Sequence, residues 1–504
     1  MSIPKIVGIE QEYAITVNRE ADLDYVEASY EIVQSYHEGG ELLEDHQAET
    51  PTNKMSQGNR GGSSKSVQGQ GNSNRILTNG SRYYVDHAHP EFSTAECLTA
   101  QEVVAFDKAG ECILNMSREY IRRASHSRRE IGIYKNNSDG KGNSFGTHEN
   151  YLLEARSFTI LFPEKATKYL IPFLVTRQIF CGAGKVGSEN GSPEVAYQIS
   201  QRADFFETIF HIKTMSSRPI INTRDEPHAD RERFRRLHLI VGDANMSEYS
   251  AYLKIGTTQI VLKMIEDYAC KGDLSLENPV EAIKAISHDP TCRARVRLND
   301  GRSLTAIEIQ QEFFEMATTY FAQVQPDEIE ADIMVKWGDV LQRLQEDPMQ
   351  LSREVDWVIK KWLLEYQIRK KPLSWRSERI KQMDIQYHSI DQKRGLFYIL
   401  QANGMVERIF EDDALISWYV REPPESTRAY FRGKCLANHF QTIDKASWDA
   451  IYFKHFQKSG REDRNGRILL LDPQRGTRHE TETLLKQSRN VEELLSNFQW
   501  LNEV

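Results

Sequence analysis

Gly8-Ile-Glu-Gln-Glu-Tyr13, near the start of the chain, is the stretch from which the architecture can be worked out. Polar and apolar residues alternate through it, which predicts a β-strand over residues 3–15. Glu10 and Glu12 then project from one face of the strand, while Ile9 points to the other. Two carboxylates at this spacing suit a hard cation such as Mg²⁺ if their face lines a cleft. By spacing alone, a solvent-exposed strand face is the simpler interpretation.

A second strand is predicted over residues 82–86, where Arg82, Tyr84 and Asp86 share one face. The titratable residues that follow are His87, His89, Glu91 and Glu96. A carboxylate such as Asp86, beside metal-bound carboxylates and an arginine, could serve as nucleophile or general base. A polar strand end would explain the same residues without any chemistry, and an isolated His-x-His pair is only a weak signal for a transition metal.

Four other features of the sequence are candidates for a site. Thr147-His-Glu-Asn150 contains an isolated polar run, and Arg224 could clamp a phosphate. His238 lies in an apolar run, and such a residue is more often a histidine of the core. Gly182-Ala-Gly-Lys-Val-Gly187 matches a dinucleotide-binding pattern by its letters. It follows a predicted helix where the pattern requires a strand, so we do not interpret it as a nucleotide site.

The composition is that of an ordinary globular enzyme. The chain has 504 residues, of which 64 are basic and 73 acidic, and its net charge is −9. An acidic balance argues against a general nucleic-acid-binding protein. No apolar run is long enough to cross a membrane, and we expect no membrane association. The six cysteines are scattered without a C-x-x-C pair, which is typical of a cytoplasmic protein with reduced thiols.

The predicted elements divide the chain into two parts. We expect a domain over residues 1–430 with a flexible insert at 37–77, and a small C-terminal domain over 431–504. The insert is rich in Gly, Ser, Asn and Gln and cannot bury a core. A long loop of this kind could act as a lid. The other expected elements are a hairpin at 131–162, strands at 218–224 and 236–243, and helices at 22–36, 101–125, 165–182, 246–270, 276–286, 306–324, 330–345, 350–370, 376–383 and 480–497.

Several long motifs occur in an order that is similar to one family. They are GIEQEY at 8–13, LTNGSRYYVDHAHPEFSTAEC at 77–97, GTHENYLL at 146–153, LIPFLVTRQIFCGAGKVG at 170–187, SSRPIINTRDEPHAD at 216–230, RLHLIVGDANMSEYS at 236–250, DIQYHSID at 384–391, PPESTRAYFRGKC at 423–435 and KASWDAIYF at 445–453. Together they resemble the Pup ligase and depupylase family, over almost the whole chain except the insert. The resemblance implies an α+β fold, in which a curved antiparallel sheet like that of glutamine synthetase is packed with helices, plus a small C-terminal domain.

The same resemblance implies roles for particular residues. Asp86 corresponds to the catalytic aspartate. The residues expected to hold Mg²⁺ are Glu10, Glu12, Tyr84, Glu91, His148 and His238. The residues expected to contact the nucleotide are Arg82, Thr94, Arg224 and Trp448. The roles given to His148, Arg224 and His238 rest on a looser analogy with the glutamine synthetase site. The expected cofactors are Mg²⁺ and ATP. Because hydrolysis is downhill, ATP need not be consumed in each turnover and could be retained as ADP and phosphate.

Within the family, two features resemble the hydrolytic members: the Asp86-His-Ala-His-Pro-Glu91 stretch and the insert. The implied reaction is deamidation of the C-terminal glutamine of the prokaryotic ubiquitin-like protein Pup, and cleavage of the isopeptide bond between Pup and a substrate lysine. The alternatives are ligation of Pup to proteins, a glutamate–cysteine-ligase-like reaction, and a Pup-binding adaptor with an inactive site.

The expected partners are Pup and pupylated proteins, with a functional link to the bacterial proteasome. Pup is acidic and disordered, so a basic groove should receive it. The candidate groove residues are Arg202, Arg231, Arg233, Arg235 and Arg236. A solvated helix face would account for the same arginines.

Overall fold

The computed structural model describes residues 2–17, 24–36, 73–124, 130–213, 217–454 and 466–498, apart from the side chains of 159–163. Most of the predicted insert, residues 37–72, lies outside the described residues. Its last part, however, belongs to the fold. Residues 74–76 form a short strand, β3, which pairs with β4.

An eight-stranded sheet forms the centre of the molecule, with the strand order β10-β11-β12-β7-β1-β5-β4-β3. The strands are β1 (Val7–Glu12), β3 (Asn74–Ile76), β4 (Arg82–Asp86), β5 (His89–Ser93), β7 (Thr147–Glu154), β10 (Thr208–His211), β11 (Pro219–Asn222) and β12 (Phe234–Leu239). All neighbouring pairs are antiparallel except β10 and β11, which are parallel. The predicted α+β class is confirmed, with one parallel pair at the edge of an otherwise antiparallel sheet.

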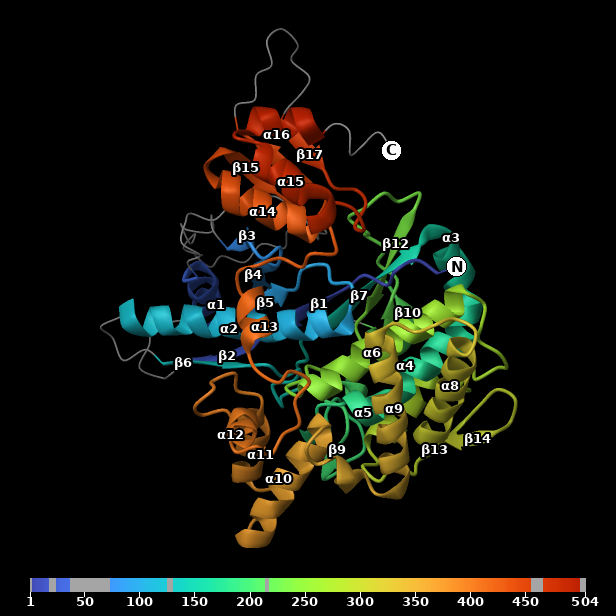
Figure 1. The fold of residues 1–504 in the computed structure, drawn as a ribbon. Coiled ribbons are helices and arrows are strands. Elements are labelled where there is room, and N and C mark those ends of the chain that lie inside the picture. Colours follow the sequence, from blue (N-terminus) through green and yellow to red (C-terminus); the bar gives the residue numbers. More distant parts are fainter. Residues whose placement is uncertain are drawn as a thin grey trace, which may run out of the picture.

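The two faces of β1 differ as the alternating sequence predicts. Val7, Ile9 and Gln11 are buried, and the residues between them are partly exposed. The buried face packs on α2 (Ala100–Ala124), which runs along the sheet (Figure 1). Gly110 of α2 allows this close approach, because a Cβ atom there would lie 2.5 Å from the ring of Phe92 on β5. The opposite face of the sheet is therefore left for polar side chains.

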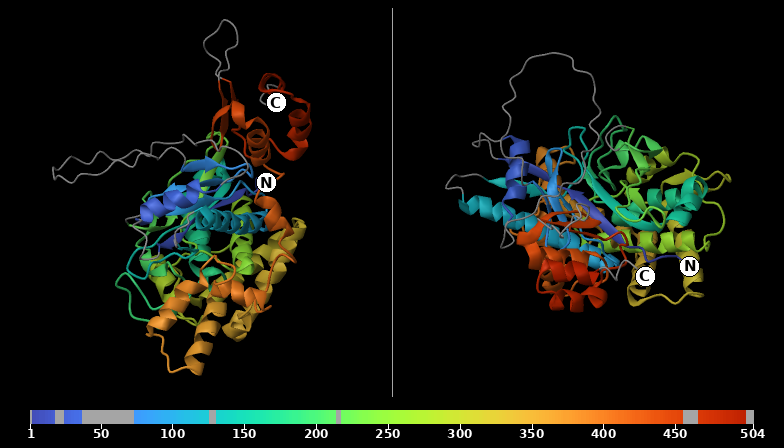
Figure 2. Two further views of the ribbon diagram at one scale, coloured as in Figure 1. Left: turned by 90° about the vertical axis from the view of Figure 1, so that its left-hand side faces the viewer. Right: turned by 90° about the horizontal axis from the view of Figure 1, so that it is seen from above.

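Helices pack around the sheet and α2, most of them below the sheet in the view of Figure 1 (Figures 1 and 2). They are α1 (Tyr25–Gln34), α3 (Ala155–Ile160), α4 (Ile171–Thr176), α5 (Gln178–Cys181), α6 (Glu248–Glu266), α7 (Pro279–Ser287), α8 (Ala306–Phe321), α9 (Glu328–Glu346), α10 (Asp356–Lys370), α11 (Glu378–Tyr387), α12 (Leu396–Ala402) and α13 (Ala414–Tyr419). Small two-stranded sheets pair β2 (Ala14–Val17) with β6 (Ile131–Tyr134), β8 (Lys185–Val186) with β9 (Tyr197–Gln198), and β13 (Arg295–Arg297) with β14 (Ser303–Thr305). Capping boxes at Thr305 and Asp327 define where α8 and α9 begin.

The predicted hairpin at 131–162 is wrong. β6 pairs with β2, whereas β7 pairs with β1 and β12. The two strands are separated because Lys135, just after β6, is buried between Asp107 and Glu111 of α2, which draws the chain away from β7. The helix predicted at 165–182 begins earlier, at residue 155, and includes a π-helical segment at Leu161–Leu170.

The C-terminal residues pack round a hydrophobic cluster of their own, which includes Phe431, Ile451, Ile468 and Leu494. The elements of this C-terminal unit are α14 (Ala429–His439), β15 (Ile443–Ala446), β16 (Ala450–Phe453), β17 (Arg467–Leu469), α15 (Arg478–Gln487) and α16 (Val491–Phe498). They lie together above β3 and β4 (Figure 1). The separate cluster supports the predicted division near residue 430, which stays a prediction. The single helix predicted at 480–497 is two helices.

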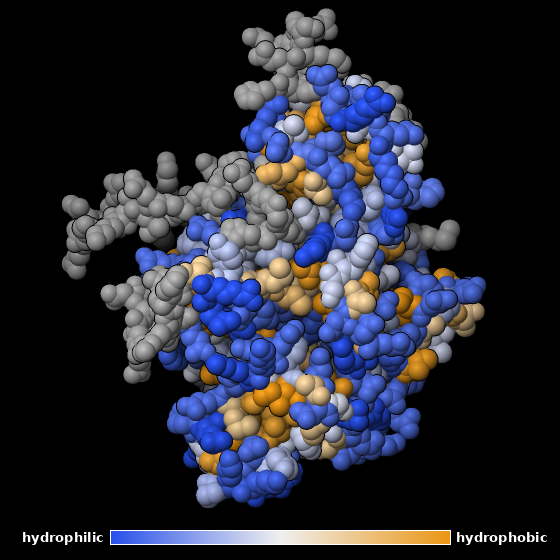
Figure 3. Space-filling view, turned by 60° about the vertical axis from the view of Figure 1, so that its left-hand side comes forward, coloured by the Kyte–Doolittle hydropathy of each residue, from blue (hydrophilic) through white to orange (hydrophobic). Residues whose placement is uncertain are grey.

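Among the described residues, no helix is long and apolar enough to cross a membrane. Most of the face shown in Figure 3 is hydrophilic, with apolar residues gathered at its lower end. At this end of the molecule α11 and α12 leave Ile385 and Ile399 about two-fifths exposed.

Candidate active site

The register of the central sheet brings the predicted site residues into rows. Residues that face each other across antiparallel strands project from the same side of a sheet. One row runs from Tyr84 on β4 through Glu91 on β5 to Glu12 on β1. The next row runs from Arg82 through Ser93 and Glu10 to His148 on β7. Local alternation thus fixes the face, and strand pairing assembles the site.

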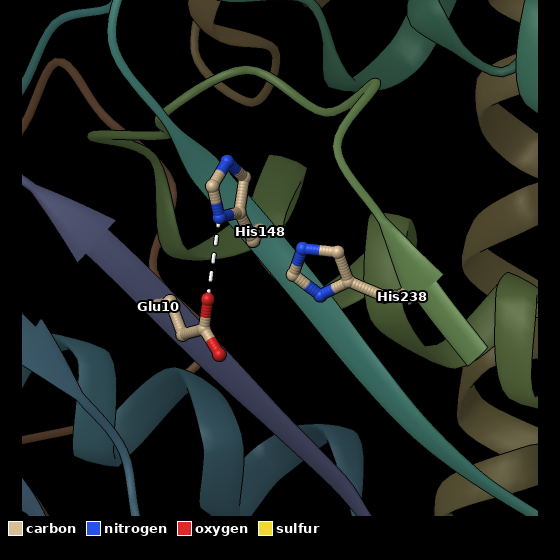
Figure 4. Close-up of side chains that lie close together, drawn as sticks. All are labelled: Glu10, His148 and His238. Atoms are coloured by element: carbon tan, nitrogen blue, oxygen red, sulfur yellow. Dashed lines mark hydrogen bonds and ion pairs between the residues drawn. The ribbon is translucent and has the colours of Figure 1, made fainter. Parts of the chain in front are cut away.

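The first cluster consists of Glu10, His148 and His238, whose ligand atoms lie within 4.8 Å of one another (Figure 4). His148 Nδ1 lies 3.2 Å from a carboxylate oxygen of Glu10. His238 Nδ1 lies 2.7 Å from the side-chain oxygen of Asn150. If His238 donates this hydrogen bond, its Nε2 keeps a lone pair that can bind a cation.

Two pKa shifts agree with a cation site in the first cluster. Burial, together with Arg236 nearby, lowers the pKa of His238 well below its usual range, which keeps the ring neutral. Burial opposes the ionisation of Glu10, but the hydrogen bond with His148 and the charges around it hold the pKa of Glu10 below its usual range. A neutral imidazole and an ionised carboxylate are the forms in which these groups bind metals.

The second cluster consists of three carboxylates, those of Glu12, Asp86 and Glu91, again within 4.8 Å of one another. Glu91 is buried. Burial raises the pKa of Glu91 well above its usual range, and the negative charges of Glu12, Glu10 and Asp86 raise it further. Three acids that repel one another, with oxygen atoms converging, fit a divalent cation that prefers oxygen ligands, such as Mg²⁺.

Tyr84 adjoins the second cluster but belongs to neither group of three. It faces Glu91 across the strand pair, and Ser93 Oγ lies 3.4 Å from its hydroxyl oxygen. Burial and the charge of Glu91 raise the pKa of Tyr84 well above its usual range, so its phenol stays protonated. The guanidinium of Arg82 lies over the Tyr84 ring, 4.2 Å from its centre, and Arg82 Nε donates to Asn74.

A cavity of about 450 Å³ lies over both clusters. The predicted site residues that line it are Glu10, Arg82, Tyr84, Asp86, Glu91, Thr94, His148, Arg224, His238 and Trp448. Of all the predicted site residues, only Glu12 is not part of its wall. The lining also includes Arg236 and Arg428, so that four arginines face a single cavity. Five carboxylates also line it, those of Glu10, Asp86, Glu91, Glu96 and Glu226. A cavity of this size and mixed charge suits an anionic ligand that binds together with divalent cations, such as a nucleotide.

The nucleotide-contact residues occupy different parts of the wall. Thr94 is buried, and its hydroxyl accepts a hydrogen bond from the Ile9 N–H at 3.0 Å, which ties β5 to β1. Arg224 is half-exposed and pairs with Glu226 at 3.0 Å. Trp448 reaches the cavity from the C-terminal unit.

Sequence reasoning missed two residues of this site. The amide of Asn150 donates to Glu10 at 3.0 Å and accepts from His238 or Arg236, so it links three predicted or charged groups. Arg236, which we assigned to a surface groove, lies in the cavity 3.8 Å from Glu10. The sequence contained a signal for both residues. Each lies two positions from a predicted histidine on the same strand and therefore projects from the same face of that strand.

The other groove candidates differ in their exposure, and their part in a groove stays a prediction except for Arg202. Arg202 is buried, with 2% of its surface exposed, which contradicts its assignment to a groove at the protein surface. Arg231 and Arg233 are exposed, and Arg235 is partly exposed. Arg233 pairs with Asp472, and Arg235 pairs with Asp225.

Comparisons with known proteins agree with this geometry. The sequence profile of the Pup-ligase protein family matches residues 5–452. A depupylase from Acidothermus cellulolyticus is 43% identical over 98% of both chains. A Pup deamidase/depupylase from Mycolicibacterium smegmatis is 37% identical over 97% of this chain and 99% of the relative. A Pup–protein ligase from Actinosynnema mirum is 45% identical, over 72% of this chain and 80% of the relative.

Two solved structures have the same fold. One is the complex between Pup and its ligase PafA, with a TM-score of 0.79 and 33% identity over 99% of this chain and 94% of that chain. The other is the Pup ligase PafA in complex with ADP, with a TM-score of 0.72 and 33% identity over 87% of this chain and 98% of that chain. From the profile match, the end-to-end relatives and the shared fold, the chain belongs to the Pup-ligase protein family.

Proposed function

We propose that this protein is a nucleotide- and Mg²⁺-dependent amidohydrolase that acts on Pup. It removes the side-chain amide from the C-terminal glutamine of Pup, and it cleaves the isopeptide bond that joins Pup to a lysine of a pupylated protein. Both reactions add water across an amide bond of the same side chain. The carbonyl carbon gains a hydroxyl group, and the leaving ammonia or lysine amine gains a proton.

One observation favours hydrolysis over ligation as the reaction of this protein. The relatives that match from end to end, over at least 97% of this chain, are named depupylase or Pup deamidase/depupylase. The relative named Pup–protein ligase has a similar identity but matches only 72% of the chain. Among these sequence relatives, the matches that span the whole chain are therefore with proteins named for hydrolysis.

The residues of the site have distinct tasks in this reaction. Glu10, His148 and His238 would hold one cation, and Glu12 and Glu91 a second. Bound Mg²⁺ would supply the positive charge that polarises the scissile carbonyl group. Binding of a nucleotide is supported by the ADP complex of the related ligase and by the arginines of the cavity. Arg82 and Arg224 would bind its phosphates, with Thr94 and Trp448 beside it.

Asp86 is the proposed catalytic residue. Its carboxylate is about two-fifths exposed, at the end of β4, and lies in the second cluster with Glu12 and Glu91. His87 Nδ1 lies 3.0 Å from it. From this position Asp86 either attacks the amide carbonyl or orients the water that does so.

The test is to incubate the purified protein with glutamine-ended Pup, with and without ATP and Mg²⁺, and to follow Pup by mass spectrometry. We expect the small mass increase of an amide converted to an acid, dependent on nucleotide and metal. A single turnover in heavy-oxygen water then bears on the role of Asp86. Label in the Asp86 side chain would show a covalent intermediate that water opens at the Asp86 carbonyl, whereas label in Pup alone fits either role. Absence of deamidation, with ATP-dependent joining of glutamate-ended Pup to a lysine protein, would establish the ligase alternative instead.

A further inference from the structure

A buried asparagine, Asn137, lies outside the cavity wall and beside the start of β7. It follows β6, and its surface is fully buried. Its backbone N–H donates to Gln201 Oε1 at 2.7 Å, and its carbonyl oxygen accepts from the Phe145 N–H at 3.2 Å. Its side-chain oxygen accepts from the Ala244 N–H at 2.7 Å. Because buried polar groups are stable only when they are paired, these bonds fix the position of Asn137 from several sides.

The side-chain amide of Asn137 starts a relay of hydrogen bonds that ends at Glu12. Its Nδ2 donates to Thr147 Oγ1 at 3.0 Å, and the Thr147 hydroxyl donates to Gln11 Oε1 at 2.8 Å. Gln11 Nε2 then donates to the backbone carbonyl oxygen of Glu12. The direction of each bond is determined, because an amide nitrogen can only donate and a carbonyl oxygen can only accept. The relay therefore ties Asn137 to the end of β1 that carries Glu12.

A second route leads from Asn137 to the side chain of Glu12. Asn137 Nδ2 also donates to the carbonyl oxygen of Phe145 at 3.1 Å. The centre of the Phe145 ring lies 4.8 Å from that of His89, and His89 Nδ1 lies 3.6 Å from a carboxylate oxygen of Glu12. The next residue, Gly146, lies against the same side chain, since a Cβ atom there would be 2.8 Å from a carboxylate oxygen of Glu12. The loop that Asn137 closes thus packs against the Glu12 carboxylate.

Glu12 needs this support because of where its carboxylate lies. It converges with the carboxylates of Asp86 and Glu91, which repel it. Unlike those two residues, Glu12 is not part of the cavity wall. A site of this kind works only when its ligand atoms are held within about 0.5 Å of the productive geometry. The backbone and the neighbours of Glu12 must therefore oppose the repulsion.

We propose that Asn137 is a positioning residue, which holds Glu12 in place to bind the cation of the second cluster. This inference rests on the proposed function and deepens it, by naming a residue that supports the site without touching metal or substrate. An amide suits this position because it accepts from one backbone N–H while it donates to a carbonyl oxygen and to a hydroxyl oxygen. An aspartate could not donate to the Phe145 carbonyl oxygen.

The experiment is a double-mutant cycle between Asn137→Ala and Glu12→Gln. Calorimetric titration with Mg²⁺ alone, without nucleotide or Pup, measures the metal affinity of the wild type, the two single variants and the double variant. We expect Asn137→Ala to raise the Kd for Mg²⁺ about ten- to a hundredfold, the range for residues that support metal ligands. In the Glu12→Gln background the further change should be less than about twofold, because the residue through which Asn137 acts is already altered.

Asn245→Ala is the matched control. Asn245 is also a buried asparagine outside the cavity wall, and its Nδ2 donates to the carbonyl oxygen of Cys181 and to Asp356, both at 3.0 Å. Loss of these bonds should lower the temperature of thermal unfolding in EDTA, as Asn137→Ala should also do. The Kd for Mg²⁺ should stay that of the wild type, because Asn245 has no connection to Glu12 of the kind that Asn137 has.

Thr147 tests the relay directly and replaces Asn137→Ala if that variant fails to fold. Thr147→Val lacks the hydroxyl that links Asn137 to Gln11, whereas Thr147→Ser keeps it. We expect Thr147→Val to raise the Kd for Mg²⁺ at least about tenfold. Thr147→Ser should restore the affinity to within about twofold of the wild type.

Three outcomes would overturn the inference. One is a folded Asn137→Ala, or in its absence Thr147→Val, that binds Mg²⁺ like the wild type. Another is an equal loss from Asn137→Ala with and without Glu12→Gln, and the third is an equal loss in Asn245→Ala; both would show a general loss of structure. A wild type that gives the expected cycle but does not deamidate Pup would refute the proposed function and not this inference. A wild type that binds no Mg²⁺ would refute both.

Discussion

The carboxylate of Glu96 is held by the guanidinium of Arg432 through two parallel contacts, one of them 3.0 Å long. Glu96 follows β5 of the central sheet, whereas Arg432 belongs to α14 of the C-terminal unit and is completely buried. Arg432 also donates to the carbonyl oxygen of Trp448 at 2.8 Å. One ion pair between the sheet and the C-terminal unit therefore sets where Trp448 meets the cavity.

Glu96→Gln should weaken nucleotide binding more than Pup binding. Loss of the negative charge weakens the hold on Arg432 and, through Arg432, on Trp448. The residues of the first and second clusters should stay in place. We expect the Kd for ADP to rise about tenfold, as for the loss of one interaction between charged groups. Titration calorimetry with ADP and with Pup measures the two affinities separately.

The control for this prediction is Glu354→Gln. Glu354 also pairs with an arginine, Arg343, at 2.9 Å, but far from the cavity in the helical part. The substitution Glu354→Gln should leave the Kd for ADP unchanged. If Glu96→Gln lowers both affinities equally, the ion pair supports folding in general and does not position Trp448.

The same ion pair makes the stability of the protein dependent on acidity. Although burial opposes ionisation, Arg432 and Arg428 lower the pKa of Glu96 from its usual value of 4.5 to about 2. Because the folded pKa is depressed, the stabilisation is complete above pH 4.5 and is lost as the pH falls from there towards 2. It amounts to about 3 kcal/mol at neutral pH. Urea unfolding of wild type and Glu96→Gln should differ at pH 7 and converge on acidification; a constant difference would contradict this.

Glu91→Gln should change stability in opposite directions with and without metal. Without divalent cations, neutralising one of three crowded carboxylates removes repulsion, so the variant should unfold at a higher temperature than the wild type. Mg²⁺ should stabilise the wild type by mass action, and the variant much less. Thermal unfolding with EDTA and with excess Mg²⁺ tests this. A variant that is less stable than the wild type in EDTA would show that the three acids do not repel as their geometry implies.

Asp86→Asn should retain Pup binding and lose turnover. The substitution keeps the size of the side chain but removes the charge needed for attack or for orienting water. We expect kcat to fall by at least about a hundredfold, the lower range for a lost general base. Mass spectrometry measures the rate, and fluorescence anisotropy of labelled Pup measures binding. Asp300→Asn, in the exposed turn between β13 and β14, is the control. Normal turnover by Asp86→Asn would remove Asp86 from the mechanism.

Much of the site could be predicted from local patterns. Alternation in β1 and β4 placed Glu10 with Glu12, and Arg82 with Tyr84 and Asp86, because a strand turns successive side chains to opposite faces. The motifs then connected distant stretches to one family. The hairpin at 131–162 failed because periodicity shows that a strand exists but does not show its partner.

Alternation alone predicted strands whose charged residues share one face, as in β1 and β4, and the scattered cysteines predicted a cytoplasmic protein, which stays a prediction. Only the tertiary structure decided which carboxylates meet. Glu12, Asp86 and Glu91 form one cluster, and Glu10 joins His148 and His238 in another, because β5, β1, β7 and β12 pair in that order. The same strand pairing places Asn150 and Arg236 beside Glu10. Contacts across strands depend on pairing over long stretches of chain, and no local rule of a single sequence specifies that pairing.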